Sequence, residues 1–130
     1  MKKVAMILSQ DLSFFNEDYR VFREAKTLIK AGYEVTVFCW AKGLDEYETK
    51  WEDEKYGVKF IRVFQDVANG LFSKGRSIGK AMQKLVTKIE EYKPDIIHAH
   101  NLDSLEAGFE ASKLNPAKVI FDIHEDLLAL

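Results

Sequence analysis

The chain has 130 residues, of which 47% are hydrophobic and 31% charged, a composition typical of one globular domain with a single core. Its formal net charge of −2 argues against a nucleic-acid-binding protein, because such proteins are usually basic. One cysteine excludes an intramolecular disulfide. With no signal peptide and no apolar run of ~20 residues, the sequence indicates a cytoplasmic protein and not a secreted or membrane-spanning one.

The first predicted elements are a strand, a helix and a second strand. Residues 4–9 form an apolar run of strand length. After a polar and aromatic loop, Asn16 offers a capping side chain that acidic residues follow, so we expect a helix that begins there and ends at Gly32. Residues 34–40 are β-branched and aromatic and form the second predicted strand. Cys39 lies within this run, so we expect a buried structural thiol and not a nucleophile.

The middle of the chain is predicted to be less regular. Residues 42–57 are charged and aromatic, and we expect an irregular excursion that carries at most a short helical turn. Residues 58–64 form the third predicted strand, with Val58, Phe60, Arg62 and Phe64 on one face. A helix over residues 77–92 follows. Its expected buried stripe, at helical spacing, is Ile78, Met82, Leu85, Val86 and Ile89.

Two more strands and a helix complete the predicted order. Pro94 stops the preceding helix, and a fourth strand follows over residues 95–99. Residues 103–106 (Asp-Ser-Leu-Glu) are similar to a capping box and open a helix to about Leu114. Residues 118–123 are the fifth predicted strand. Because strands alternate with helices, we predict an α/β fold: a Rossmann-like doubly wound parallel sheet of about five strands in the order 3-2-1-4-5.

Histidines follow the fourth and fifth predicted strands, where such a sheet binds its ligands. In open α/β sheets the binding crevice lies beyond the carboxyl ends of the strands, at the point where the strand order reverses. Here that point lies between the first and fourth strands. We therefore expect His100 with Asn101, the segment at His124, and the loop after the first strand to converge on one site.

Two of these histidines have the spacing of some metal sites. His98 and His100 lie two apart on a strand and therefore share a face, and Asp122 is a conceivable third ligand. However, Asp122 need not lie at the same height, and no further Cys or His cluster supports a metal. We therefore favour ordinary hydrogen-bonded histidines and predict no metal. His100, nearer the strand end, is the expected ligand contact, and His98 is expected to be structural.

Basic residues offer two further candidate surfaces. Arg20 either grips a phosphate or carboxylate in the cleft or pairs with a neighbouring acid, whereas Arg23 is expected to be a surface charge. A second set recurs every four residues on the helix over 77–92 and just before it: Arg76, Lys80, Lys84 and Lys88. This stripe is either a solvated helix face or a peripheral docking surface for anionic lipid.

Three segments together resemble family-4 glycosyltransferases. Residues 18–25 (Asp-Tyr-Arg-Val-Phe-Arg-Glu-Ala), with the Ala-Gly-Tyr-Glu-Val-Thr-Val run at 31–37, are similar to the opening helix and second strand of that family. Residues 94–101 (Pro-Asp-Ile-Ile-His-Ala-His-Asn) resemble its Pro-Asp-(Ile/Val)-(Ile/Val)-His-(Ala/Val)-His segment, and residues 121–125 (Phe-Asp-Ile-His-Glu) resemble its Tyr-Asp-x-His-Glu segment. The order of the segments matches over nearly the whole chain. One departure is the loop before Asn16, which has none of the glycines found in many members.

The resemblance implies the GT-B architecture, in which two Rossmann-like halves enclose the active site. Residues 1–130 would be the N-terminal, acceptor-side half, and the donor-binding half with its Glu-x7-Glu motif is absent from this chain. The parent enzyme would transfer a sugar from a nucleotide-sugar to a hydroxyl acceptor with retention, without a metal or other cofactor. The isolated chain would be inactive. Many relatives use lipid-linked acceptors, which would place the enzyme at the inner membrane face.

The resemblance also separates the roles of the predicted site residues. His124 would be the catalytic residue that orients and polarises the sugar or acceptor hydroxyl, while the donor phosphate takes the proton. Arg20, His100, Asn101 and Glu125 would bind substrate, although Asn101 and Glu125 also suit helix capping. Two alternatives remain open: another GT-B enzyme such as a nucleotide-sugar epimerase, and a free-standing flavodoxin-like binding module.

Overall fold

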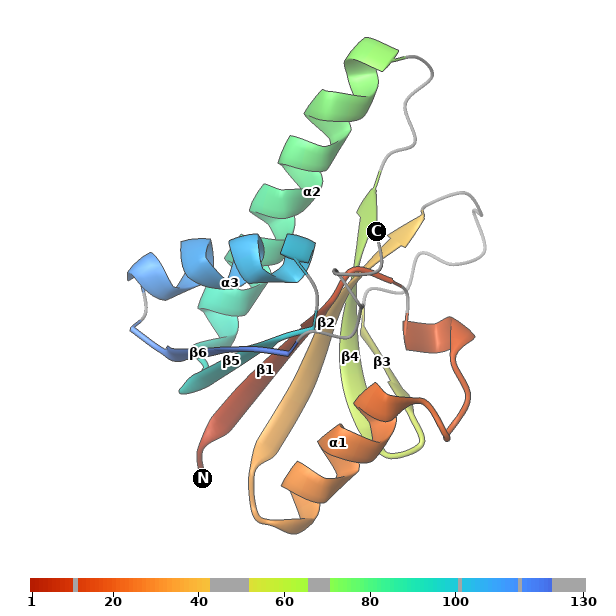
Figure 1. Ribbon diagram of the computed structural model, residues 1–130, viewed down its shortest axis with the longest axis vertical. Coiled ribbons are helices and arrows are strands. Elements are labelled where there is room, and N and C mark those ends of the chain that lie inside the picture. Colours follow the sequence, from red (N-terminus) through yellow and green to blue (C-terminus); the bar gives the residue numbers. More distant parts are fainter. Residues whose placement is uncertain (11, 43–51, 66–70, 101, 115, 123–130) are drawn as a thin grey trace, which may run out of the picture.

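A computed structural model describes residues 1–10, 12–42, 52–65, 71–100, 102–114 and 116–122 (Figure 1). Six strands form one sheet in the order β3-β4-β2-β1-β5-β6. The strands are β1 (Lys3–Leu8), β2 (Glu34–Lys42), β3 (Glu52–Lys55), β4 (Val58–Gln65), β5 (Ile96–Ala99) and β6 (Lys118–Phe121). The helices are η1 (Leu12–Phe14, a 3-10 turn), α1 (Arg20–Lys30), α2 (Leu71–Tyr92) and α3 (Leu102–Leu114).

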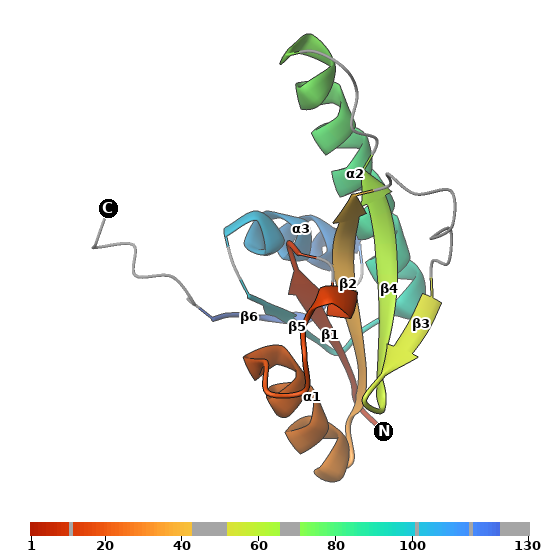
Figure 2. The same ribbon diagram turned by 90° about the vertical axis from the view of Figure 1, so that its right-hand side faces the viewer.

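The sheet confirms the predicted fold class and the predicted order of the parallel strands. β4, β2, β1, β5 and β6 pair in parallel, in the expected 3-2-1-4-5 order. Helix α1 covers one face of the sheet, and α2 and α3 cover the other (Figures 1 and 2). This arrangement is the doubly wound topology expected from alternating strands and helices.

A sixth strand replaces part of the expected irregular excursion. β3 pairs antiparallel with β4, and Lys55 lies opposite Val58. The two residues between them, Tyr56 and Gly57, have φ of 52° and 79°, as a tight two-residue hairpin turn requires. The expectation of a helical turn here was wrong for residues 52–57. Residues 43–51 lie outside the described residues.

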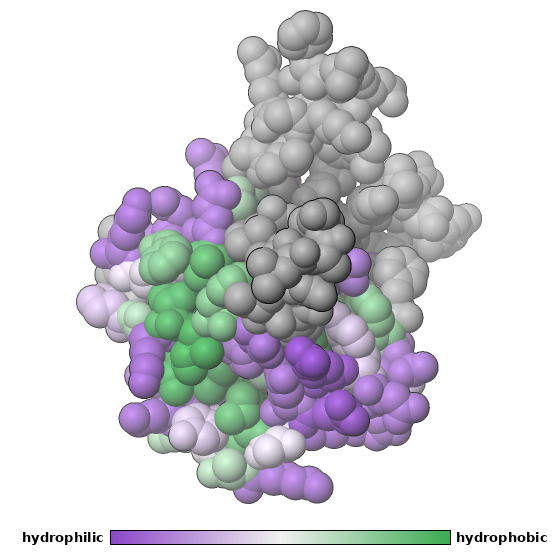
Figure 3. Space-filling model, viewed as in Figure 1, coloured by the Kyte–Doolittle hydropathy of each residue, from purple (hydrophilic) through white to green (hydrophobic). Residues whose placement is uncertain are grey.

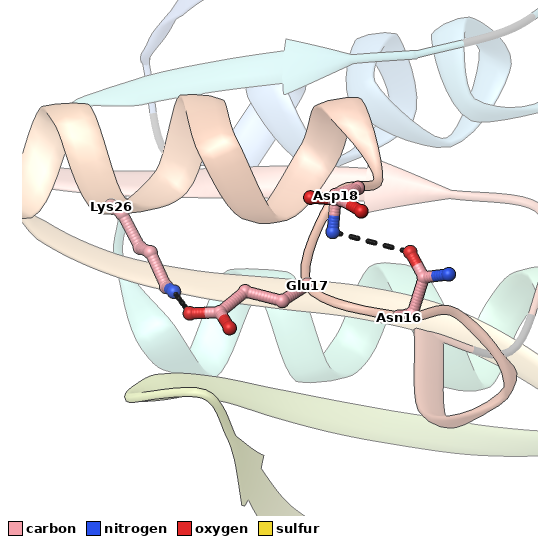
Figure 4. Close-up of polar contacts among 4 residues, drawn as sticks. All are labelled: Asn16, Glu17, Asp18 and Lys26. Atoms are coloured by element: carbon pink, nitrogen blue, oxygen red, sulfur yellow. Dashed lines mark hydrogen bonds and ion pairs between the residues drawn. The ribbon is translucent and has the colours of Figure 1, made fainter.

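The first helix begins later than predicted. Asn16 Oδ1 accepts a hydrogen bond from the backbone N–H of Asp18 at 3.2 Å, and Glu17 pairs with Lys26 (Figure 4). Asn16 therefore closes a local turn, a common alternative use of an Asn side chain. The helix starts at Arg20, after Tyr19, without a side-chain cap.

The predicted end of this helix is confirmed at Gly32. The Gly32 N–H donates to Ile29 O and the Tyr33 N–H to Leu28 O, each at 3.0 Å. This is the Schellman pattern, which needs a residue of positive φ just past the helix, and Gly32 has φ +96°. Two other boundaries differ from prediction, since α2 begins at Leu71 and α3 at Leu102. The box over residues 103–106 therefore lies inside the first turns of α3 and does not precede it.

The core consists of two apolar layers, one on each face of the sheet. Val21, Phe22 and Ala25 of α1 pack on the face of β1, β2 and β4 that Cys39 also faces. Cys39 is buried, which confirms the expected structural thiol. On the opposite face, Leu85 of α2 packs with α3 and the sheet. The side chain of Ile78 lies outside the described residues, and the other members of its predicted stripe are buried or half-buried.

Candidate functional site

His98 of β5 and His100, which follows that strand, lie on the side of the sheet that α1 covers, and their spacing predicted that they share a face. In the parallel register, His98 lies beside Met6 of β1 and Ile120 of β6. The pairing continues past the strand ends, because the His100 N–H donates to Ile7 O at 3.1 Å and the Asp122 N–H donates to Ala99 O at 2.8 Å. Both histidines thus lie near the carboxyl end of the sheet, at the point where the strand order reverses.

This register overturns one argument made from sequence. Asp122 Oδ2 lies 3.7 Å from His98 Nε2, so β6 does bring this carboxylate to the height of the histidines. Helix α1 contributes a second carboxylate, because Glu24 Oε2 lies 3.9 Å from His100 Nδ1. One ligand atom from each of these four side chains lies within 4.8 Å of the other three. Four charged or titratable groups from three elements therefore converge.

The two histidines differ in burial. His100 is 1% exposed, whereas the side chain of His98 is 17% exposed and lines a cavity. Their rings are 4.3 Å apart and inclined by 31°. His98 therefore lies on the cavity, whereas His100 is buried beside Glu24 and is not part of the cavity wall. The predicted roles, ligand contact for His100 and structure for His98, stay predictions.

The cavity lies on the α1 face of the sheet and has a volume of about 550 Å³. Its wall is formed by Val4, Arg20, Arg23, Glu24, Thr27, Leu28, Tyr33, Ile96, His98 and Ile120. Apolar side chains come mainly from β1, β5 and β6, and charged ones from α1. Figure 3 shows hydrophobic residues gathered beside α1, over β5, β6 and α3, and Ile120 is 42% exposed there. The cavity therefore combines an apolar floor with a polar rim.

The polar rim is one stripe of α1. Arg20, Arg23, Glu24 and Thr27 lie at i, i+3, i+4 and i+7, the spacing of a single helix face. Arg20 lies on the cavity, as one of its two predicted alternatives requires. Arg23 is exposed, as predicted, but it also lines the cavity, so it is more than a surface charge. Sequence reasoning missed Glu24 and Thr27, although this polar stripe beside the apolar one was visible in the sequence.

Tyr19 precedes this stripe and is ordered by packing. Its ring stacks on Phe15 with a centroid distance of 3.9 Å. Burial raises the pKa of the Tyr19 phenol, the Arg20 charge lowers it, and the Glu24 carboxylate raises it. The phenol therefore remains neutral at physiological pH and is a hydrogen-bonding group beside the rim.

Several predicted site residues cannot be placed. Asn101, His124 and Glu125 lie outside the described residues, so their roles stay predictions. The loop after β1 was expected in the crevice, but none of its described residues lines the cavity. In the basic stripe, the side chains of Arg76 and Lys80 are outside the described residues.

The rest of the basic stripe lies on the outer side of α2. Lys84 is exposed, and Lys88 Nζ lies 3.8 Å from Glu91 Oε2, so lipid docking stays a prediction. Within the described residues, no helix has the length and apolarity to cross a membrane.

Solved structures share this fold at low sequence identity. Sucrose-phosphate synthase from Thermosynechococcus elongatus aligns with a TM-score of 0.69 and 14% identity, over 96% of this chain and 33% of that protein. The trehalose-6-phosphate synthase structure from E. coli with UDP-2-fluoro glucose aligns with a TM-score of 0.64 and 10% identity, over 92% of this chain and 32% of that one. The C-terminal domain of a hydrogenase from Pyrococcus furiosus aligns with a TM-score of 0.62 and 16% identity, over 94% of this chain and 92% of that one.

These likenesses establish the fold, and this chain spans about a third of the two synthases. A comparison with curated protein sequences found no match. The sequence profile described as Glycosyltransferase Family 4 matches residues 19–128, which contain α1, both histidine segments and every residue of the cavity lining except Val4. The chain therefore belongs to glycosyltransferase family 4.

Proposed function

We propose that this chain is the N-terminal, acceptor-side half of a GT-B glycosyltransferase. The parent enzyme transfers a sugar from a nucleotide-sugar to a hydroxyl with retention, and a C-terminal half supplies the donor site. The observation that carries the proposal is that two segments matched to the family, the opening of α1 and the end of β5, line one cavity with Arg20 and His98.

The chemistry of this cavity suits a polyhydroxylated or anionic acceptor. The guanidinium groups of Arg20 and Arg23 donate hydrogen bonds to hydroxyl or phosphate oxygens, while Glu24 accepts them from hydroxyls. The ring of His98 can donate or accept a hydrogen bond, according to its tautomer. The apolar wall packs against the C–H face of a sugar ring or an aliphatic substituent. A volume of about 550 Å³ lies in the usual range for small-molecule sites.

The reacting centre is assigned to the segment that follows β6. His124 orients and polarises the acceptor hydroxyl, and the donor phosphate takes its proton, so the transfer needs no metal. Asn101 and Glu125 hold sugar hydroxyls beside it. This assignment rests on the family resemblance of residues 94–101 and 121–125, and on the rule that such sheets bind ligands beyond their strand ends.

The test is steady-state kinetics of the parent enzyme with Arg20→Ala. Loss of a charge-assisted hydrogen bond should raise the KM for the acceptor by roughly 10- to 100-fold and leave the KM for the donor unchanged. Lys30→Ala is the matched control, because Lys30 is an exposed cation on the same helix and away from the cavity. An unchanged KM for the acceptor in Arg20→Ala would show that this cavity does not bind the acceptor.

A second pair of measurements tests the division between the halves. His124→Ala in the parent enzyme should lower kcat with little change in donor KM, and near-normal turnover would contradict its assigned role. Calorimetry of the isolated chain with a nucleotide-sugar should detect weak binding or none. Tight binding would contradict the assignment of the donor site to the other half.

A further inference from the structure

We propose that Glu24, His98, His100 and Asp122 form a site for a divalent transition-metal ion, and that Zn²⁺ is the ion that it suits best. This proposal does not rest on the proposed function. It departs from the metal-free site expected from sequence, because the carboxylate that was doubted as a ligand lies beside the histidines and a second one joins it from α1.

The donor set selects the class of ion. Two imidazole nitrogens and two carboxylate oxygens are ligands that Zn²⁺ takes in four-coordinate sites. Mg²⁺ and Ca²⁺ prefer oxygen ligands alone, so the two histidines disfavour them. The carboxylates carry two negative charges when ionised and balance the charge of a divalent ion. This balance offsets the repulsion from Arg20 and Arg23 on the same cavity.

The distances are close to those of a loaded site. With bond lengths of ~2.0–2.2 Å, the ligand atoms of a tetrahedral Zn²⁺ site lie about 3.4 Å apart. The His98–Asp122 and His100–Glu24 pairs are separated by 3.7 and 3.9 Å, and one ligand atom from each of the four side chains lies within 4.8 Å of the other three. Small rotations of the carboxylates, whose side chains are partly exposed, would therefore close the ligand shell.

The backbone holds the ligands in place before any ion binds. The His100 N–H donates to β1 at Ile7 O, and the Asp122 N–H donates to β5 at Ala99 O. Glu24 lies in the middle of α1, between the buried Phe22 and Ala25. A bound ion would thus cross-link α1 to β5 and to the end of β6. Its role is structural, and the proposed transfer reaction uses no metal chemistry. Because Glu24 and His98 also line the cavity, a bound ion would withdraw these two side chains from acceptor binding and leave Arg20 and Arg23 for that role.

The first experiment titrates the 130-residue chain, stripped with a chelator, with ZnCl₂ and separately with CoCl₂. We expect one Zn²⁺ per chain by calorimetry, and visible absorption bands of four-coordinate Co²⁺ at the same stoichiometry. Because the ion binds the folded chain, Zn²⁺ at 100 times its Kd should lower the unfolding constant by about 100-fold and raise the Tm. Absence of saturable binding up to about 1 mM Zn²⁺ would overturn the proposal.

Variants then locate the ion. His98→Ala and Asp122→Asn should each weaken Zn²⁺ binding by more than about 100-fold, because loss of an outer-shell partner alone typically costs 10- to 100-fold. Glu24→Gln should do the same, and Glu106→Gln, at an exposed position of α3, is its matched control. Circular dichroism of the metal-free variants checks folding. If His98→Ala does not fold, Asp122→Asn still tests whether the ion binds at this site, because the side chain of Asp122 is partly exposed and its replacement should not disturb the core.

Two results would place the ion elsewhere and refute the site. Binding that survives in Asp122→Asn and Glu24→Gln would show that these carboxylates are not ligands. Binding that is lost in His124→Ala but kept in His98→Ala would assign the ion to another histidine of the chain. A Co²⁺ spectrum with thiolate charge-transfer bands would implicate Cys39, which lies in β2.

Discussion

Phe22→Ala tests whether α1 is set on the sheet as described. Phe22 is 0% exposed, and its ring meets Tyr56 of the β3–β4 turn edge-on at a centroid distance of 5.2 Å. Truncation of a buried Phe costs ~3–5 kcal/mol of unfolding free energy. Tyr56 is half-exposed, so its ring contact adds only the lower part of the ~0.5–1.5 kcal/mol typical of aromatic pairs. For a domain of this size the Tm should fall by about 10–18 °C.

The assay is urea and thermal unfolding of the chain, followed by circular dichroism. Ile29→Ala is the control, because Ile29 lies on the same helix but is 39% exposed, and its truncation should change the unfolding free energy by less than ~0.5 kcal/mol. If Phe22→Ala lowered the unfolding free energy by less than ~1 kcal/mol, the ring of Phe22 would not be buried between α1 and the sheet. Arg23 and Glu24 follow it on the helix at ~100° per residue, so the cavity rim would then be misplaced as well.

Three further predictions concern the stability of the fold. Gly32→Ala should destabilise the chain by ~1 kcal/mol in urea unfolding. The cause is backbone strain at φ +96° and not a clash, because no atom lies within 4 Å of an added Cβ. Gly32→Asn should lose less stability, and equal stability of Gly32→Ala and wild type would contradict the strain. Gly108→Leu should cost ~1–3 kcal/mol and Gly108→Ala less, since even a Cβ would lie 3.1 Å from Ile97 Cγ2; a neutral Leu variant would mean that α3 lies farther from β5. Burial raises the pKa of the Tyr92 phenol, so the unfolded phenol ionises first and stability should fall above about pH 10, by less than ~1 kcal/mol per pH unit because the group is partly exposed; Tyr92→Phe should flatten this loss, and identical slopes would contradict it.

The parallel strands were predictable because their pattern is repeated and local. Apolar runs alternate with helical stripes, and the handedness of the crossovers then leaves few strand orders. β3 was not predictable in this way, since its sequence Glu-Asp-Glu-Lys has four charged residues and little β propensity. It forms at the sheet edge, where β4 and the tight turn at Tyr56 and Gly57 supply the pairing. The start of α1 was mispredicted because Asn16 can close a turn as readily as it caps a helix.

The site was predictable only to the extent that its residues share a strand. The alternation of side chains placed His98 and His100 on one face, and the structure agrees. The depth of each histidine depends on what covers that face, which is set by α1 from another part of the chain. Glu24 was missed for the same reason, because its contact with His100 spans distant segments. Whether Asp122 lies beside His98 depends on the register between β5 and β6, which sequence spacing does not determine.

Glu24 both contacts His100 and lines the cavity, so its variants should change stability and ligand binding together. One face of α1 packs into the core through Val21 and Ala25, and the neighbouring stripe lines the cavity. Both stripes lie on one rigid helix, so a contact that holds Glu24 to β5 also fixes where Arg20 lies. Arg20→Ala removes a cavity charge without touching the core and should change ligand binding alone. Glu24→Gln should change both stability and ligand binding, because it weakens the tie between α1 and β5.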